Sequence, residues 1–476
     1  MWGLEVDASP PGLYNITALH RFSEPVDPAI LHRAVGLLVA RHESLRTGFT
    51  RDQGRISQTV APTATVEMPV TDLGTTTGGQ AHEQEAGLQR LLAAQDAEPF
   101  DLGRPPLFRC HLYRRGDGDS VLAVTFDHLI SDGTSAYIFL SEVADTYAAL
   151  ARGDAPALAP LPVQYPDFAV WQRRSLTEER RRAQMEYWKQ VLAGTPPGPA
   201  LAFDRMPSTP TRRIAARPLA VPPERYRGLN RLARAAHGTM FVVCVAAVDV
   251  ALHAAGGSTD IVFSTTLSGR QRAELDGVIG YFANIGRIRT DLSGDPTFAQ
   301  IVERARGSVL GLFEHQDIPF MQVREAVFPA FASGAGGHPL AALPVELQYF
   351  HAGQDGWAPG IGVVERPGPD KGPDELFFRG QLHPLSVSLL DDGSQLWGEI
   401  NYKTDFYDEA TIEGLARGLE QLVATVAVDS GDSAVHGGTR PSQRRLSELV
   451  AVASGRGLEG ASAGREHRLV GTWRLD

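Results

Sequence analysis

The strongest constraint on the fold is a proline-rich break at residues 195–199 (TPPGP), which divides a chain of 476 residues into two long runs. Each run alternates short apolar segments typical of strands with longer segments whose apolar residues recur at helical spacing. A single hydrophobic core stops growing at roughly 250–300 residues. The sequence therefore predicts an α+β protein with two lobes, the second repeating the theme of the first.

Periodicity and turn residues predict where the elements lie. In the first half we expect strands at 14–22, 45–51, 55–60, 105–114 and 120–127, and helices beginning at residues 28, 80 and 134. In the second half we expect strands at 213–221, 260–266, 345–350, 383–390 and 395–402, and helices at 224–237, 239–254, 297–316 and 410–428. This order predicts a first lobe at 1–175, a connecting helix and linker at 176–204, a second lobe at 205–430 and a tail at 431–476 that either docks or is disordered.

Composition excludes several classes of function. Lys and Arg number 45 against 56 Asp and Glu, and the net charge of −11 gives no overall attraction for a nucleic-acid backbone. Cys110 and Cys244 lie in apolar surroundings, so we expect buried thiols rather than a disulfide scaffold. The N-terminus lacks the features of a signal peptide, and no apolar run reaches the roughly 18 residues of a membrane span. We expect a cytoplasmic monomer that binds neither nucleic acid nor membrane.

One segment concentrates groups that can do chemistry. The apolar run 121–126 leads into Asp127 and His128, and Asp132 and Gly133 follow after three further residues. This pattern predicts a buried strand that turns sharply into a helix. His128 has an unperturbed pKa suited to proton transfer near neutral pH, and Asp132 can fix the turn by accepting hydrogen bonds. Gly133 permits a backbone angle or a close approach that a Cβ would prevent. A histidine at a strand end also has an ordinary structural role, so the pattern alone does not decide the function.

Four other segments accompany this turn in a fixed order along the chain. They are RHESLRTGF at 41–49, YPDFAVWQ at 165–172, IGYFAN at 279–284 and HQDIPF at 315–320. Together with DHLISDG at 127–133, the series resembles the condensation domains of nonribosomal peptide synthetases, whose HHxxxDG motif it matches except at the first position. The resemblance covers about residues 14–428.

The resemblance implies two chloramphenicol-acetyltransferase-like lobes set in a V, with a central tunnel between them. A donor held on the phosphopantetheine of a peptidyl or acyl carrier protein would be joined to an amine or hydroxyl acceptor in natural-product biosynthesis. The protein itself would bind no cofactor. By match to the motif, His128 would be the catalytic histidine, Asp132 a structural aspartate held by an arginine, and Gly133 would leave space beside the tunnel. Arg46 and Arg270 are the two candidates for that arginine.

The motif departs from the family at Asp127, where the first histidine is expected. Successive side chains on a strand point to opposite faces, so we do not expect Asp127 and His128 to touch. On this argument the first position serves packing or the geometry of the turn, and transfer activity survives. The alternative is a catalytically silent relative that recruits a carrier protein or a tailoring enzyme. A third hypothesis is a transferase that uses soluble acyl-CoA, as more distant relatives do.

The remaining candidates carry weaker signals. Ser131, Asn284, His383 and Ser386 are predicted to line the tunnel, with turn geometry as the alternative for Asn284. The basic run at 180–182 is either a solvated helix face or a place where an acidic carrier protein docks.

Other site types have little support in the sequence. The 14 histidines do not pair with cysteines or carboxylates at metal-ligand spacing, so we expect no metal. The patterns GxGxxG at 455–460 and GxSxG at 460–464 lack the strand–turn–helix context that nucleotide binding or a serine nucleophile needs. Because no adenylation or carrier segment follows the last motif, we expect a free-standing protein rather than an excised domain.

Overall fold

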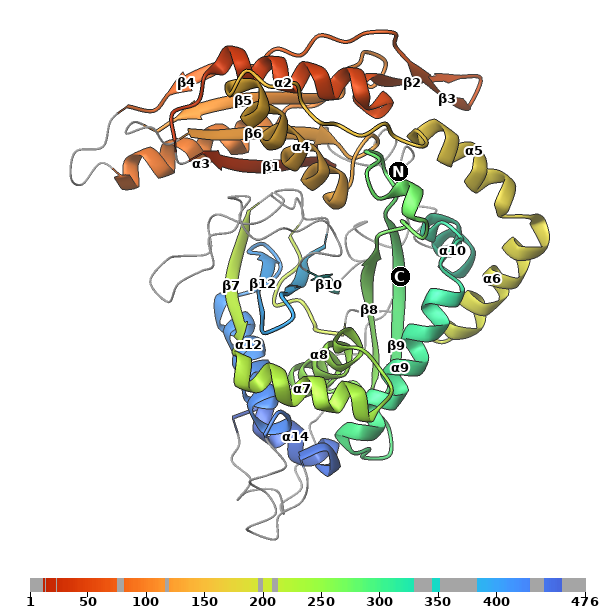
Figure 1. Cartoon of the computed structure of the whole chain (residues 1–476). Helices are drawn as coiled ribbons and strands as arrows, with labels where there is room; N and C mark the ends of the chain where they lie inside the picture. Colours follow the sequence, from red (N-terminus) through yellow and green to blue (C-terminus); the bar gives the residue numbers. More distant parts are fainter. Residues whose placement is uncertain are drawn as a thin grey trace.

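The first lobe is a four-stranded sheet, ordered β1-β6-β5-β4, with helices on both faces (Figure 1). The computed structural model describes residues 12, 14–22, 24–74, 81–115, 120–195, 200–207, 213–328, 345–351, 383–428 and 441–455. The elements of the first lobe are β1 (Asn15–Phe22), α2 (Pro28–Arg41), η1 (Glu43–Arg46), β2 (Thr47–Asp52), β3 (Arg55–Val60), β4 (Val70–Asp72), α3 (Ala81–Ala97), β5 (Phe108–Arg114), β6 (Ser120–Asp127) and α4 (Gly133–Ala151). Strands β2 and β3 form a separate hairpin.

Strand β6 lies inside this sheet and is buried at every position. It pairs antiparallel with β1 on one side and with β5 on the other. Leu122 and Phe126 pack into the core shared with α2 and α4, whereas Val121 and Ala123 pack against α3 on the opposite face. An apolar run without alternation is the pattern expected of a strand covered on both faces. The strand therefore delivers Asp127 and His128 to the edge of a rigid sheet.

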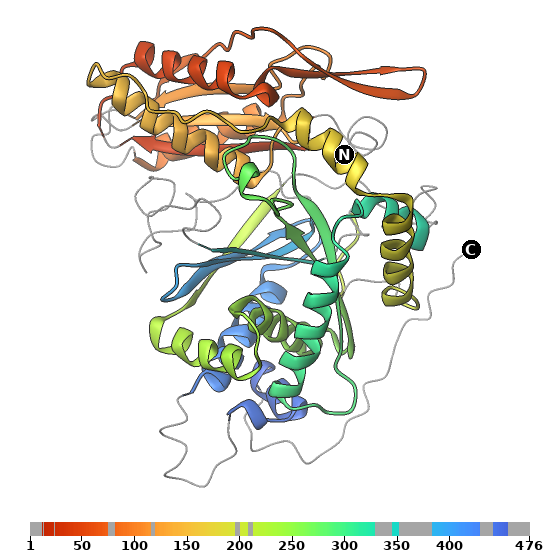
Figure 2. The same ribbon diagram turned by 45° about the vertical axis from the view of Figure 1, so that its right-hand side comes forward.

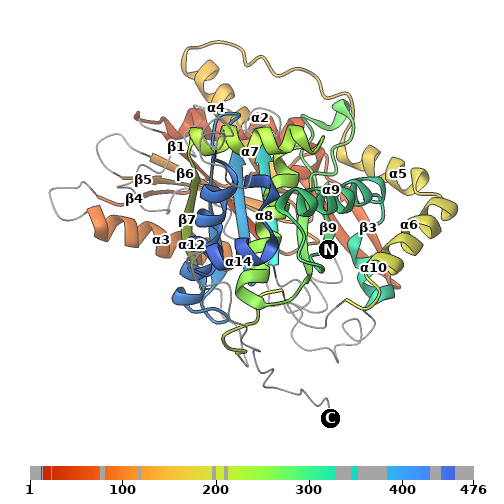
Figure 3. The same ribbon diagram turned by 90° about the horizontal axis from the view of Figure 1, so that it is seen from below.

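The second lobe is a six-stranded sheet ordered β7-β12-β11-β10-β8-β9. Strand β10 runs parallel to β11 and β8, and the other pairs are antiparallel. Helix α8 is apolar nearly all round and lies buried among the other helices of this lobe (Figure 3). The elements are β7 (Ile214–Val221), α7 (Pro223–Ala235), α8 (Met240–Gly256), β8 (Asp260–Leu267), β9 (Asn284–Asp291), α9 (Phe298–Glu314), α10 (Phe320–Val327), β10 (Val345–His351), β11 (Leu385–Asp391), β12 (Leu396–Lys403) and α12 (Glu409–Val426).

Helices α5 (Tyr165–Ser175) and α6 (Glu178–Val191) connect the lobes along one side of the molecule. Helix α6 lies in the predicted connecting segment 176–204, and it packs on the second lobe. The Trp188 indole N–H donates to the backbone oxygen of His315 at 2.9 Å, and Gln184 Nε2 donates to Asp317 Oδ2 at 2.8 Å. By its packing, α6 is part of the second lobe.

For the predicted tail at 431–476, docking and disorder are the two alternatives. Its described part, residues 441–455, contains η4 (Pro441–Gln443) and α14 (Leu446–Ala453). Leu446 and Leu449 enter the core of the second lobe, and the Leu446 N–H donates to Pro296 O at 2.8 Å. This part of the chain docks, and the patterns that follow Gly455 lie outside the described residues.

The segment between β8 and β9, residues 268–283, is called here the crossing segment because it rises from the second lobe to the first (Figure 2). It contains the short helix η2 (Ala273–Leu275). Ile279 is part of the first-lobe core, and Phe282 packs with Phe168 of α5. The two lobes are therefore joined through apolar packing as well as through the chain itself.

Three further properties concern the described part of the chain. No single helix there is long and apolar enough to cross a membrane, and only α7 with α8, bent by 102°, meets the length and composition criteria together. No group of three or more His, Cys, Asp or Glu side chains in the described residues is placed to hold a metal ion. Cys110 and Cys244 are both buried and free, as predicted.

Candidate active site

His128 is the first residue after β6, and its ring is held in one orientation. Nδ1 lies 2.7 Å from the backbone oxygen of Ser131. Because a carbonyl oxygen can only accept, Nδ1 carries the proton of the neutral ring and Nε2 keeps a lone pair. The ring meets Tyr281 of the crossing segment edge to face, with 5.0 Å between centroids. His128 therefore presents Nε2 as a base where the two lobes meet.

The environment of His128 favours this neutral ring. Burial lowers the pKa of His128 below its usual value, since the imidazolium loses its hydration. The Ser131 carbonyl and the carboxylates of Asp132 and Asp127 raise the pKa of His128, but by less than burial lowers it. At neutral pH the ring is thus predominantly ready to accept a proton.

Asp132 fastens the turn after His128 to the crossing segment. Its Oδ1 caps α4 by accepting from the Ser135 N–H at 2.8 Å, and its Oδ2 accepts from the Phe282 N–H at 2.9 Å. Arg270 Nη2 lies 3.4 Å from Asp132 Oδ1, and the two side chains are only 5% and 4% exposed. Asp132 acts on the backbone of both lobes and is a positioning residue rather than a proton donor.

Of the two predicted arginine partners, the structure places Arg270 and not Arg46 at Asp132. Arg46 lies at the end of η1, where Nη1 donates to Ala61 O at 2.6 Å and Nη2 lies 3.5 Å from Glu43 Oε1. These contacts hold the start of the β2–β3 hairpin. Arg46 therefore does not contribute to the candidate site.

Ser135 and Gly280 complete the junction, and Ser135 was not among the predicted site residues. Ser135 Oγ receives a hydrogen bond from Arg270 Nη2 at 2.8 Å and from the Gly280 N–H at 3.0 Å, and itself donates to Gly280 O at 2.8 Å. A Cβ at Gly280 would lie 2.1 Å from the Tyr165 ring, so only glycine fits. The signal available was position: Ser135 is three residues after Asp132, in the capping relationship.

Gly133 and Asp127 shape the two ends of the turn. Gly133 is the first residue of α4 and has helical backbone, so the left-handed angle considered for it is not used. Asp127 is 2% exposed, and its Oδ1 accepts from the Leu129 N–H at 2.8 Å. This contact turns the Asp127 side chain into the loop, whereas His128 faces Tyr281. The replacement of the first motif histidine therefore leaves an Asx turn that holds the loop.

The four residues that were predicted to line the tunnel make contacts with neighbouring parts of the fold. Ser131 is fully buried and fixes His128 through its carbonyl oxygen. Asn284 Nδ2 donates to Gln316 O and Ile318 O, both at 2.9 Å, so it anchors the start of the segment before α10. His383 Nε2 lies 3.4 Å from Glu346 Oε2. Ser386 lies opposite Glu346 in the β10–β11 register, and both are buried.

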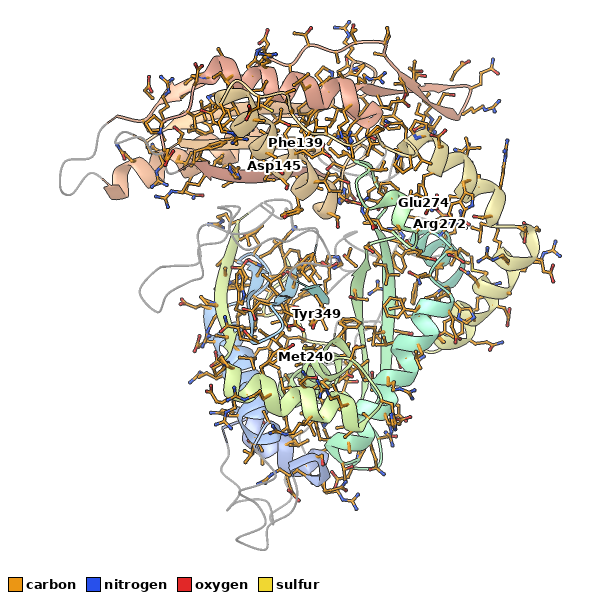
Figure 4. All side chains as sticks on the ribbon, in the orientation of Figure 1. Phe139, Asp145, Met240, Arg272, Glu274 and Tyr349 are labelled. Carbon is orange, nitrogen blue, oxygen red and sulfur yellow. The ribbon has the colours of Figure 1, made fainter. Side chains whose placement is uncertain are left out.

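A cavity of about 530 Å³ lies between α5, α6, the crossing segment and α10. Tyr281, which contacts the His128 ring, forms part of its wall, and Asn284 lines it as well. Trp171 and Arg272 stand at its rim, where the guanidinium carbon lies 4.7 Å from the indole centroid. Figure 4 labels Arg272 between the lobes, on the side of α5. The cavity therefore connects bulk solvent with Tyr281, the residue that packs on His128.

Comparison with known proteins identifies relatives over nearly the whole chain. The family model described as Condensation domain matches residues 1–434. A linear gramicidin synthase of Brevibacillus parabrevis is 33% identical over 427 residues, 90% of this chain and 8% of its own length. Phosphinothricin tripeptide synthetase PhsC of Streptomyces viridochromogenes is 33% identical over 435 residues, 90% of this chain and 39% of its own length. The chain thus spans less than half of either relative.

Solved structures agree with this assignment. The X-domain from teicoplanin biosynthesis is 28% identical, with a TM-score of 0.74 and 94% of each chain covered. The first condensation domain of the calcium-dependent antibiotic synthetase is 24% identical, with a TM-score of 0.68 over 88% of this chain and 93% of its own, and shows the fold alone. These matches confirm the predicted α+β fold of two chloramphenicol-acetyltransferase-like lobes. The chain belongs to the condensation-domain family of nonribosomal peptide synthetases.

Proposed function

We propose that this protein is an acyltransferase that joins a carrier-bound acyl or aminoacyl thioester to an amine or hydroxyl acceptor. The observation that carries the proposal is the orientation of His128. Its Nδ1 is tied to Ser131 O at 2.7 Å, so the nitrogen left with a lone pair is Nε2, where Tyr281 and the crossing segment meet the first lobe. Membership of the condensation-domain family supports the reaction class.

In this reaction the nitrogen or oxygen of the acceptor substrate attacks the thioester carbonyl carbon. As it does so, it gives its proton to His128 Nε2. The tetrahedral intermediate then collapses, the C–S bond breaks, and the phosphopantetheine thiolate takes the proton from His128. The acceptor gains an amide or ester, and the histidine returns to its neutral form. Phosphopantetheine arrives and leaves with the carrier protein as part of the substrate.

The cavity beside Tyr281 supports a route for one of the two substrates. Arg173 and Arg174 are exposed on α5 between the cavity-lining residues Gln172 and Ser175, whereas Arg180 and Arg182 of the predicted basic run are engaged with Asp317 and Glu178. We therefore expect an acidic carrier protein to dock on α5 rather than α6. The double variant R173E/R174E should slow turnover of a carrier-bound substrate at least fivefold and leave a small N-acetylcysteamine thioester unaffected. R182E is the matched control.

Intact-mass tracking of loaded carrier proteins with a panel of nucleophiles tests the transfer itself. The expected result is loss of the acyl group from one carrier and its appearance on one nucleophile, abolished by H128A. H111A is the control, because His111 lies on β5, where Nε2 contacts Thr71 Oγ1 at 2.8 Å, away from the site. Equal product formation by wild type and H128A would overturn the catalytic role. Equal turnover of acyl-CoA would overturn dependence on a carrier.

A second candidate function, recruitment of a partner protein, has its own supporting observations. Asp127 replaces the first motif histidine, and the X-domain from teicoplanin biosynthesis, 27% identical with a TM-score of 0.72, has been solved in complex with OxyB. Under this hypothesis wild type and H128A would bind a carrier protein or enzyme with equal affinity, and neither would transfer an acyl group.

A further inference from the structure

A second cavity, of about 240 Å³, lies inside the second lobe and away from His128. It is lined by residues of α7, α8 and α12 together with β7, β11 and β12. Its wall is made almost entirely of apolar side chains, among them Leu219, Val243 and Leu389. The acyl-transfer chemistry proposed above makes no use of this space.

The sequence keeps this space open with small residues. Ala247 of α8 and Ala424 of α12 both line the cavity. Protein interiors are otherwise close-packed, and larger apolar side chains at such positions would fill the volume. A void with so few polar groups gives water almost no hydrogen-bonding partners, so it is dry or holds an apolar molecule.

Two charged residues line the cavity, Arg225 of α7 and Glu420 of α12. Glu420 Oε1 accepts from Arg217 Nη1 at 2.7 Å, so this carboxylate is paired. Arg225 Nη1 donates to the backbone oxygen of Ala424 at 2.9 Å, and because that oxygen is neutral the guanidinium keeps its positive charge. Apolar contacts therefore provide most of the recognition, and the polar end of a ligand can lie at Arg225.

We infer that this cavity is a binding site for a small, predominantly apolar molecule. A cavity of roughly 150 Å³ lined by Leu, Ile and Phe holds benzene, so the present one suits a larger molecule, such as an aliphatic chain of about eight carbons. Cys244 also lines the wall, so the rate at which its thiol is chemically modified reports whether the cavity is occupied. Cys110, the other thiol, lies in the core of the first lobe and serves as an internal reference.

Binding of 1-octanol to the whole chain tests the inference. We expect 1-octanol to raise the melting temperature of the wild type by at least 2 °C. It should also slow modification of Cys244 by methyl methanethiosulfonate at least threefold, with no effect on Cys110, as followed by peptide mass mapping. An absent thermal shift, or equal protection of both thiols, would overturn the site.

The variant A247L should occupy the cavity itself. We expect it to melt at a higher temperature than the wild type and to lose the response to 1-octanol. A246L is the matched control, because Ala246 is fully buried on the same helix and does not line the cavity, so the added carbons have no space. An A247L protein that is less stable than the wild type, or that still responds to 1-octanol, contradicts the inference whether or not A246L folds.

Discussion

Arg270 and Asp132 are 138 residues apart and come from different lobes, yet their side chains meet at 3.4 Å in a region that solvent barely reaches. The same guanidinium donates to Val278 O at 2.8 Å and to Ser135 Oγ at 2.8 Å. One arginine therefore links the crossing segment, the cap of α4 and the turn that carries His128. The geometry of the candidate base depends on how the two lobes are joined.

Replacing this arginine should destabilise the junction. R270Q leaves the Asp132 carboxylate buried without its cation, and breaking a buried pair in this way costs about 3–5 kcal/mol. We expect a fall of that size in the free energy of unfolding measured with urea. R46Q is the control, with an expected loss of about 1 kcal/mol for its hydrogen bonds. Equal losses for the two variants would contradict the role assigned to Arg270.

The glycine of the junction gives a second prediction. In G280A the new methyl group meets the Tyr165 ring at 2.1 Å, so the crossing segment or α5 must shift. Overpacking of this kind typically costs about 1–3 kcal/mol. G277A, in the same segment, places its Cβ 3.5 Å from Leu161 Cδ2 and should leave the melting temperature nearly unchanged. If both variants melt like the wild type, the close approach does not constrain the junction.

The protonation of His128 can be followed without knowing a substrate. Burial lowers its pKa, so the ring should gain its second proton only at a pH below about 6.5. NMR titration of the histidine ring protons, with the His128 signal assigned by its absence in H128A, measures this directly. The rate of acyl transfer should stay level as the pH falls from neutrality and drop only below that same midpoint. A midpoint at or above 6.5 would contradict the assignment.

The departure at Asp127 predicts a contrast between two variants. D127N keeps the side-chain oxygen that accepts from the Leu129 N–H, so its stability should stay close to that of the wild type. D127A loses that acceptor and leaves the N–H unpaired, which costs about 1–3 kcal/mol. Urea unfolding compares the two. Equal stability of D127A and D127N would show that the Asx turn does not matter.

A carboxyl group in the second lobe should make stability depend on pH. Asp249 lies on α8 with no exposure, and burial raises its pKa to about 8. The folded state then holds a proton that the unfolded chain releases near pH 4, so stability falls by up to about 1.4 kcal/mol per unit between pH 4 and 8. D249N should remove this slope and be the more stable protein at pH 8. The control is D145N, at an exposed aspartate of α4 labelled in Figure 4, which should keep the fall in stability between pH 4 and 8.

Elements whose signals are local could be predicted from the sequence. Helix α2 begins at Pro28 as expected, and Asp27 caps it by accepting from the Ala29 N–H at 2.8 Å. The 120–127 run is a strand because helices cover both of its faces. The turn from β6 into α4 also has the predicted form, with Asp132 as the cap. In each case the residues that determine the structure are neighbours in the chain.

Features that depend on distant partners could not be predicted. Strand β9 was missed because Arg287 and Arg289 interrupt its apolar pattern, and only the fold supplies their partners on β8. Helix α10 and the short strand β4 were missed as well. For the same reason the sequence could not show that Arg270, rather than Arg46, contacts Asp132. The IGYFAN motif pointed to the right segment, but nothing in it indicated that Tyr281 would pack on His128.

The hydrogen bonds between the lobes involve main-chain atoms of residues 279–282. The backbone groups in these contacts belong to Ile279, Gly280, Tyr281 and Phe282. Hydrogen bonds to the main chain do not depend on side-chain identity. The side chains of Ile279 and Phe282 are buried in the packing that joins the lobes, however, and a side chain at Gly280 would meet Tyr165. Evolution can therefore alter the wall facing the substrates at Tyr281, while the alignment of the two halves is inherited unchanged.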